Sequence, residues 1–313
     1  HLGEGEVLVA EADESDASFL YLQPMLAVVT NVDEDHMVTY GNDFERLRAT
    51  FLEFLHHLPF YGLAVMCVDD EHVRGLLPEV TRKVLTYGTR EEADVCALDI
   101  RQQGMTTHFD VQMRGQEPFS ITLSLPGRHN VLNALAAITV AHELGVAVDS
   151  IQSGLAGFEG IGRRFQATTG CQIGGHRVML VDDYGHHPRE VAATLDAVRA
   201  GWPGQRLVLA FQPHRYSRTQ DAFEDFVAVL SQVDVLILAE VFAAGETPIA
   251  GADGRALSRA IRARGQVDPV FLDNIEDLPV RLQDLVADGD IVVTMGAGNI
   301  GLVAANMAEA LCP

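Results

Sequence analysis

Short apolar runs alternate with longer amphipathic stretches through the first half of the chain. Val7–Ala10 and Leu26–Thr30 are apolar runs that end in acidic or polar clusters, as buried parallel strands do. Apolar residues recur at helical spacing from Phe44 to Leu58, and Leu63–Val68 has the pattern of another strand. Two antiparallel strands around a turn at Arg114–Gly115 and a helix ending before Gly145 are also predicted, over Thr106–Val111, Phe119–Leu125 and Asn130–Leu144.

The second half of the chain repeats one strand–helix unit. The predicted strands are Val178–Val181, Leu207–Phe211, Val235–Ala239, Pro269–Leu272 and Ile291–Thr294. The predicted helices are Glu190–Ala200, Ala222–Leu230, Arg255–Arg264, Ile275–Val286 and Ile300–Leu311. This alternation predicts an α/β fold with a parallel, doubly wound sheet. A glycine-spaced stretch, Gly154–Gly162, precedes the repeat, so we expect two domains, 1–157 and 158–313.

The composition fits two globular domains and excludes several classes of partner. The chain has 313 residues, of which 48% are hydrophobic and 21% charged, a length typical of two domains. Its formal net charge of −22 excludes nucleic acid or an anionic membrane as the main partner. No apolar run approaches the ~20 residues of a membrane span, so we expect no membrane contact.

Lysine and cysteine usage narrows the interpretation further. Lys83 is the only lysine, and no glycine-rich Gly-Lys-Ser/Thr sequence surrounds it, so the chain has no P-loop of its own. The cysteines are Cys67, Cys96, Cys171 and Cys312. They lack C-x-x-C spacing, which argues against a zinc site and predicts free thiols in a reducing cytosol. The chain begins at His1 with neither a methionine nor a signal peptide, and we expect a piece of a longer, cytoplasmic protein.

Acidic clusters follow the first two predicted strands. Glu11–Asp16 contains four carboxylates in six residues, and Asn31–His36 adds three acids and a histidine. Ligands of open α/β sheets bind beyond the carboxyl ends of the strands. Mg²⁺ takes one or two carboxylates together with phosphate oxygens and water, so these loops suit a hard divalent cation. The alternative is a pair of solvated acidic loops without a ligand.

Two clusters of a different kind follow strands of the second half. Val178–Val181 leads into Asp182–Pro188, where Asp and Tyr can hydrogen-bond a hydroxyl and two histidines can donate to phosphate or carboxylate. Leu207–Phe211 leads into a stretch with Arg215 and Arg218, which are three residues apart and can converge on one anion. The alternative is that these cations pair with the many acids of the surface.

A G-x-G-x-x-G sequence, Gly296–Gly301, follows the last predicted strand. A dinucleotide fingerprint opens its domain at the first strand and has an acid ~20 residues further on, whereas this copy closes the domain. We therefore expect a tight turn that packs the last helix on the sheet.

Together, six blocks in this order resemble the ATP-dependent Mur ligases. The blocks are Glu11–Leu20, Thr30–Met37, Pro126–Asn133, Gly162–Phe165, Asp182–Pro188 and Gln212–Thr219. The resemblance implies an α/β protein with a truncated central P-loop-type ATPase domain, without its P-loop, followed by a C-terminal Rossmann-like doubly wound domain. A UDP-sugar-binding domain of that family is not represented in the chain, and the missing P-loop predicts that the chain alone is inactive.

The resemblance also implies roles for individual residues. Glu11 and His36 match magnesium-binding positions, with Glu14 as the alternative to Glu11. The residues matching the ATP site are His129, Asn130 and Asn133 on the adenine side, Arg164 at the phosphates and Asp183 at the ribose. The residues matching the pocket for the amino acid and the lactoyl carboxylate are Tyr184, His186, Arg215 and Arg218, with His214 beside them.

The implied reaction is the ATP- and Mg²⁺-dependent addition of L-alanine to UDP-N-acetylmuramate through an acyl phosphate, in the bacterial cytoplasm. The candidates for the base that takes the ammonium proton are His36 and His186. A related ligase that joins a tripeptide to the same sugar nucleotide is the nearest alternative, and a non-catalytic fragment that binds a ligand or partner is another. A homodimer is also possible.

Overall fold

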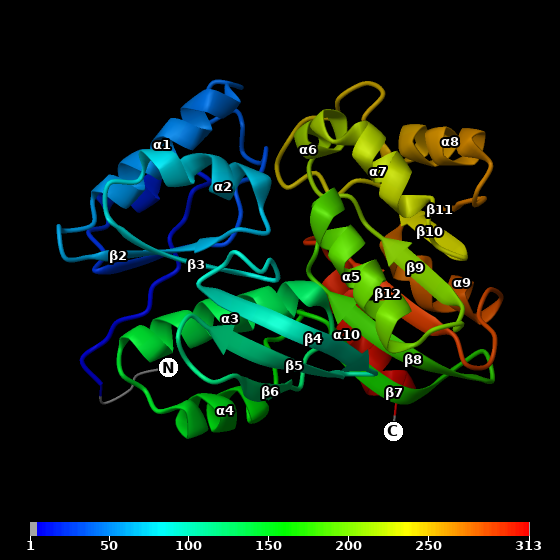
Figure 1. Ribbon diagram of the computed structural model, residues 1–313. Coiled ribbons are helices and arrows are strands. Elements are labelled where there is room, and N and C mark those ends of the chain that lie inside the picture. Colours follow the sequence, from blue (N-terminus) through cyan, green and yellow to red (C-terminus); the bar gives the residue numbers. More distant parts are fainter. Residues whose placement is uncertain (1–4, 313) are drawn as a thin grey trace. The chain divides into compact units, whose positions relative to one another are not determined.

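A computed structural model describes residues 5–312 and divides the chain into two compact units. Among the described residues, unit 1 comprises 5–100, 108–122 and 130–156, and unit 2 comprises 101–107, 123–129 and 157–312. Each unit contains one six-stranded sheet (Figure 1). The division into domains at 157/158 stays a proposal. No helix of the described part of the chain is long and apolar enough to cross a membrane.

The sheet of unit 1 has the strand order β1-β2-β3-β4-β5-β6. The strands are β1 (Leu26–Val29), β2 (Leu63–Cys67), β3 (Lys83–Gly88), β4 (Val95–Gln103), β5 (Thr106–Met113) and β6 (Phe119–Leu123). The pairs from β1 to β4 are parallel. The helices are η1 (Ser18–Tyr21), α1 (Phe44–His56), α2 (Glu71–Leu76), η2 (Leu77–Glu79), α3 (Arg128–Glu143) and α4 (Val148–Ala156).

Helix α1 shows why this half of the chain folds as its pattern predicts. Asp43 caps the helix by accepting hydrogen bonds from the backbone N–H groups of Glu45 and Arg46. Its buried positions, Leu47, Phe54 and Leu55, recur at helical spacing and face the core. That core also contains Phe19, Tyr40 and the fully buried side of β2. The strands and helices predicted at 26–30, 44–58, 63–68 and 130–144 are therefore confirmed.

The strand predicted at Val7–Ala10 is wrong. The segment is extended coil, and the side chains of Leu8 and Val9 are 90% and 88% exposed. A strand needs a hydrogen-bonded neighbour, because its own backbone groups cannot pair with one another. None of the described strands pairs with this segment, so its apolar pattern has no sheet to join.

The sheet of unit 2 has the order β11-β10-β9-β12-β8-β7. Its strands are β7 (Gln166–Ile173), β8 (His176–Asp183), β9 (Leu207–Phe211), β10 (Val235–Ala239), β11 (Val270–Leu272) and β12 (Ile291–Met295). Strands β8 to β12 are parallel to one another, and β7 is an antiparallel edge strand that pairs with β8. The five predicted strands are confirmed, and β7 was not predicted.

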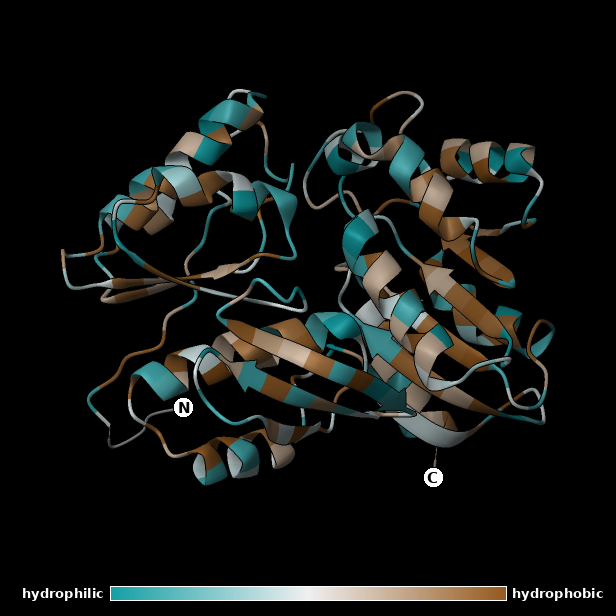
Figure 2. Ribbon diagram, viewed as in Figure 1, coloured by the Kyte–Doolittle hydropathy of each residue, from teal (hydrophilic) through white to brown (hydrophobic). Residues whose placement is uncertain are grey.

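Helices cover both faces of this sheet. They are α5 (Pro188–Gly201), α6 (Tyr216–Asp221), α7 (Phe223–Leu230), α8 (Gly254–Arg264), η3 (Ile275–Asp277), α9 (Leu278–Gln283) and α10 (Ile300–Leu311). Leu207, Leu209 and Phe211 of β9 pack in one core with α5, α7 and α8, whereas Val208 and Ala210 pack in a second core with α9 and α10. Because both of its faces are buried, the central strand β9 is apolar along its whole length (Figure 2). The predicted doubly wound α/β fold is confirmed.

Two of the four cysteines form a disulfide, which corrects the expectation of free thiols. Cys171 of β7 is bonded to Cys312, which follows α10, with an S–S distance of 1.97 Å. Cys67 and Cys96, both in unit 1, are free and buried. The spacing of 141 residues carries no signal of pairing, because the contact exists only once α10 has packed beside β7.

Candidate active site

The parallel strands of unit 2 bring four loops to one edge of the sheet. Three of these loops supply aromatic rings that lie in a row, Tyr184, His186, His214 and Phe242, which follow β8, β9 and β10. Ring centroids are 5.3 Å apart for Tyr184 and His186, 5.7 Å for His186 and His214, and 5.6 Å for His214 and Phe242. We call these four residues the ring row. Its members come from separate stretches of sequence, so the topology of the sheet assembles it.

Arg215 and Arg218 lie beside the ring row at the start of α6. Arg215 is the N-cap residue with φ of 69°, a conformation that costs a non-glycine residue roughly 1–3 kcal/mol. The bond from its N–H to the Phe242 carbonyl, 2.9 Å, helps to hold this backbone. The guanidinium of Arg215 is exposed and makes no hydrogen bond or ion pair with another described residue, whereas Arg218 is buried. Both arginines thus belong to one helix start, and their convergence on one anion stays a prediction.

His214 is held as a neutral imidazole. Its ring stacks on Phe242 at an interplanar angle of 11°, and its buried Nδ1 has no hydrogen-bond partner among the described residues. Burial lowers its pKa to about 4, and the nearby charges of His186, Arg218 and Arg215 act in the same direction. At neutral pH this ring can accept or donate a hydrogen bond without adding charge.

Glu246 provides the cap that Arg215 cannot give to α6. Its carboxylate accepts hydrogen bonds from the backbone N–H of Ser217, at 3.0 Å, and from the Ser217 hydroxyl, at 2.6 Å. Burial opposes the charge, but these bonds lower the pKa of Glu246 below its ordinary value. The loop after β10 therefore stabilises the helical turn that carries both arginines.

At the end of β8, Asp183 ties the preceding segment to the sheet. It is 6% exposed, and its two carboxylate oxygens accept the N–H groups of Phe165, at 2.8 Å, and Gly185, at 2.7 Å. Burial raises its pKa, while these two bonds lower it. The contact with a ribose stays a prediction and would use the remaining lone pairs of these oxygens.

Arg163 and Arg164 project from the segment that Asp183 holds. Arg163 donates to Asp182, at 2.9 Å, and to the Gly296 carbonyl, at 2.7 Å. A Cβ at Gly301 would lie within 2.5 Å of the Arg163 guanidinium, so this glycine leaves room for the arginine. The glycine-rich loop thus packs α10 on the sheet. Arg164 is half-exposed and lies over the Tyr184 ring, 5.5 Å from its centroid.

In unit 1 the predicted metal-binding residues lie on two separate loops. Glu11 is exposed, and His36 adopts a positive φ of 53° with its ring 3.6 Å from Asp35. No group of three or more metal-ligating side chains forms within residues 5–312. One carboxylate and one imidazole still fit the number of protein donors that Mg²⁺ takes when phosphate and water complete its coordination. Glu11 and His36 stay a prediction on this chemistry.

The predicted adenine-side residues lie in the first turns of α3. His129 precedes Asn130 and Asn133, which are three residues apart and therefore share one face of the helix. Burial lowers the pKa of His129, so its ring is neutral. Their role on the adenine side stays a prediction.

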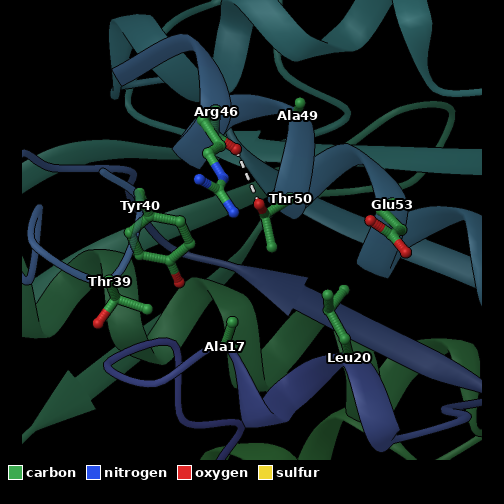
Figure 3. Close-up of a pocket in the computed structure, with 8 residues that line it drawn as sticks. All are labelled: Ala17, Leu20, Thr39, Tyr40, Arg46, Ala49, Thr50 and Glu53. Carbon is green, nitrogen blue, oxygen red and sulfur yellow. Dashed lines mark hydrogen bonds between the residues drawn. The ribbon is translucent and has the colours of Figure 1, made fainter. Parts of the chain in front are cut away.

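Unit 1 also contains a cavity of about 320 Å³ between η1, the residues before α1, and α1 itself (Figure 3). Its lining residues are Ala17, Leu20, Thr39, Tyr40, Arg46, Ala49, Thr50 and Glu53. None of the predicted site residues lines it.

Sequence reasoning missed several residues that organise the site of unit 2. These are Arg163, Glu190, Gln212, Phe242 and Glu246. Gln212 accepts the N–H of Ile300 and donates to Asn299, which joins the loop after β9 to the start of α10. Phe242 and Glu246 follow a strand that was predicted correctly, so the rule applied to the other strand ends would have found them.

The fold and the side chains at the strand ends define a two-unit α/β protein whose second sheet carries a cluster of arginines and imidazoles at these ends. Comparison with known families identifies residues 3–141 as a Mur ligase middle domain and residues 163–298 as the glutamate ligase domain of Mur ligases. The chain therefore belongs to the Mur ligase family and contains its middle and C-terminal domains, as the six sequence blocks predicted.

Similar proteins agree with this assignment. The chain is 60% identical over 310 residues to the UDP-N-acetylmuramate–L-alanine ligase of Methylococcus capsulatus, covering 99% of this chain and 66% of that protein. The crystal structure of the UDP-N-acetylmuramate-alanine ligase MurC of Thermotoga maritima matches with a TM-score of 0.74 and 24% identity, over 95% of this chain and 62% of that one. The MurF ligase of Thermotoga maritima in complex with ADP matches with a TM-score of 0.70 and 23% identity, over 91% and 62%. The chain thus spans about two thirds of the length of these relatives.

Proposed function

We propose that this chain provides the middle and C-terminal domains of an ATP-dependent ligase that joins L-alanine to UDP-N-acetylmuramate in the bacterial cytoplasm. The observation that carries the proposal is the convergence of Arg215, Arg218 and the ring row at one edge of the second sheet. An amino acid presents a carboxylate and an ammonium, and this edge offers guanidinium groups for the first and imidazoles for the second. The 60% identity to the Methylococcus ligase supports the choice of substrates.

In the proposed reaction ATP and Mg²⁺ supply an activated muramoyl carboxylate, an acyl phosphate. Arg215 and Arg218 would bind the alanine carboxylate and orient its nitrogen. His186 would take a proton from the ammonium, and the amine would then attack the acyl carbon while phosphate leaves. His36 is the other candidate for this proton transfer. His214 would stay neutral, and its ring would line the site beside Phe242.

The proposed nucleotide-binding residues take their roles from the matching sequence blocks. His129, Asn130 and Asn133 would contact the adenine side, Arg164 the phosphates and Asp183 the ribose. Glu11 and His36 would hold Mg²⁺, a role that suits a carboxylate and an imidazole completed by phosphate oxygens. A homodimer stays a prediction.

A phosphate-release assay with ATP, Mg²⁺ and UDP-N-acetylmuramate tests the proposal. It compares this chain with a form extended upstream to the length of the Methylococcus relative. We expect release from the extended form only, and far more with L-alanine than with the tripeptide L-Ala-γ-D-Glu-diaminopimelate. A preference for the tripeptide would favour the recycling reaction, and no response to either in the extended form would contradict a ligase.

A further inference from the structure

Glu190 contacts both halves of the site in unit 2. It lies in the first turn of α5, and its Oε2 accepts the backbone N–H groups of His186, at 2.8 Å, and His187, at 3.0 Å. The same oxygen is 3.4 Å from Nδ1 of the His186 ring. Its other oxygen, Oε1, is 3.4 Å from the Arg164 guanidinium. One carboxylate is therefore shared between the arginine predicted to meet phosphate and an imidazole of the ring row.

We propose that Glu190 is a positioning residue that couples phosphate binding at Arg164 to proton transfer at His186. In the structure Arg164 offsets part of the charge that Glu190 presents to the imidazole. When the guanidinium turns to a phosphate, the full carboxylate charge acts on His186 and strengthens it as a proton acceptor. The inference rests on the proposed function for the identity of the anion and of the ammonium.

The contacts of His186 define which nitrogen would accept the proton. Nδ1 lies 3.2 Å from the Tyr184 carbonyl and 3.4 Å from Glu190, and both of these neighbours are hydrogen-bond acceptors. The ring hydrogen of the neutral form therefore belongs on Nδ1, which leaves the lone pair on Nε2. One ammonium N–H bond breaks as the Nε2–H bond forms, and the freed amine pair bonds to the acyl carbon. Phosphate leaves with the electron pair of the acyl C–O bond and takes the second proton that the nitrogen loses as the amide forms.

Glu190 is an ionised neighbour of the His186 ring. Burial opposes the ionised form of Glu190, but its hydrogen bonds from His186 and His187 and the charges of His186 and Arg164 lower its pKa, so it is a carboxylate at neutral pH. His214, on the loop after β9, stays neutral because burial lowers its pKa to about 4.

Other groups of the strand-end loops lie around His186 and its neighbours. Arg215 and Arg218 act on His214, and the oxygens of Asp183 accept the backbone N–H groups of Phe165 and Gly185. Tyr184 presents its ring, 5.3 Å from that of His186.

Nuclear magnetic resonance of the His186 ring in this chain tests the coupling without ligands. The ring signals are assigned with His186→Gln and followed across pH. Glu190→Gln should move the titration midpoint to lower pH by roughly threefold to tenfold in the protonation constant, because the carboxylate charge is lost. Arg164→Gln should move it to higher pH by a smaller factor, because the competing cation is lost.

A matched control separates this effect from helix capping. Asp253 caps α8 by accepting the Ala256 N–H at 2.6 Å and does not contact His186, so Asp253→Asn removes a capping charge of the same kind. It should destabilise the unit without moving the midpoint. A midpoint unchanged in Glu190→Gln, or moved equally by Asp253→Asn, overturns the coupling. A midpoint that is unchanged or lowered in Arg164→Gln also overturns the coupling. If Glu190→Gln does not fold, the Arg164→Gln variant alone decides the test.

The outcome is independent of the ligase assay. A shifted midpoint in a chain whose extended form joins no amino acid would contradict the proposed function alone. An unshifted midpoint in an active ligase would contradict only the coupling.

Discussion

The two candidate regions of this molecule differ in what holds their side chains in place. In unit 2 the site residues are tied to other strand ends: Asp183 to Phe165, Glu190 to Arg164, and Glu246 to Ser217. In unit 1 the acidic side chains accept backbone N–H groups of their own turns, such as Ser15 N–H to Asp13 and Glu34 N–H to Asp33, while Thr39 and Tyr40 donate to backbone carbonyls of the first loop.

The difference follows from charge. The site of unit 2 combines carboxylates with arginines and histidines, so its members attract one another and the fold can assemble it without a ligand. The loops of unit 1 concentrate carboxylates, which repel one another until a cation lies among them. We therefore expect the first site to be preorganised and the second to depend on its metal.

The largest effect should come from the exposed arginine of unit 2. Arg215→Ala in the extended form should lower kcat/KM for L-alanine by about 100-fold, because a charged contact to the substrate carboxylate is lost. Nucleotide binding and folding should be retained, since this guanidinium makes no ion pair within the described residues. Initial rates at varied L-alanine and a thermal melt measure both.

Arg259→Ala is the matched control for that variant. Arg259 is also exposed, but it lies in α8 and outside the loops of the site. Equal kcat/KM values for the two variants would show that Arg215 is not part of the site. The site of unit 2 would then be no better preorganised than that of unit 1.

The second effect concerns the disulfide, which among the described residues is present only in unit 2. Reducing the Cys171–Cys312 disulfide should lower the free energy of unfolding of that unit by about 2–4 kcal/mol. Urea unfolding with and without dithiothreitol measures it. Cys312→Ser should reproduce the loss under oxidising conditions and show no further response to the reductant. A wild-type chain insensitive to dithiothreitol would mean that all four cysteines are thiols, as their spacing first predicted.

The elements that the sequence predicted correctly are those whose signal is local. Buried parallel strands such as Leu207–Phe211 are continuous apolar runs, and α1 combines a cap with helical periodicity. Strand β7 is polar, half-exposed and bulged between Thr168 and Cys171, and only its pairing with β8 makes it a strand. Helix α2 has six residues, too few for a periodic signal.

The site was predictable to the extent that it follows strand ends. Tyr184, His186 and Arg215 were found because each follows an apolar strand in a short polar stretch. Glu190 was missed because its sequence context is that of an ordinary helix start, and its contacts with Arg164 and His186 appear only in three dimensions. The disulfide was missed for the same reason.

A third test addresses the dependence of unit 1 on its metal. Glu11→Gln or His36→Asn in the extended form should raise the Mg²⁺ concentration for half-maximal turnover at least about tenfold, because a ligand is lost. Mg²⁺ titrations of the initial rate measure it. Glu34→Gln, an exposed acid of the same loop as His36, is the control and should change little. If all three variants had equally small effects, the two loops would be solvated acidic loops that bind no metal.

The smallest effect should be the pH dependence that His214 gives to unit 2. Burial lowers its pKa from the ordinary 6.5 to about 4, so between these values the unfolded chain binds more protons than the folded one. Stability from this group is therefore complete above about pH 6.5 and is lost as pH falls toward 4. Because solvent reaches part of the ring, the expected decrease in the free energy of unfolding is about 1–2 kcal/mol.

Urea unfolding at pH 7, 5.5 and 4.5 measures that loss, and His214→Gln should reduce the slope because glutamine does not titrate. His108→Gln is the control, because His108 is exposed and hydrogen-bonds only to Thr122 of the neighbouring strand. A slope unaltered by His214→Gln but reduced by His108→Gln would mean that the ring of His214 is solvated in the folded chain. The ring row would then be as loosely held as the acidic loops, and the contrast between the two regions would fail at His214.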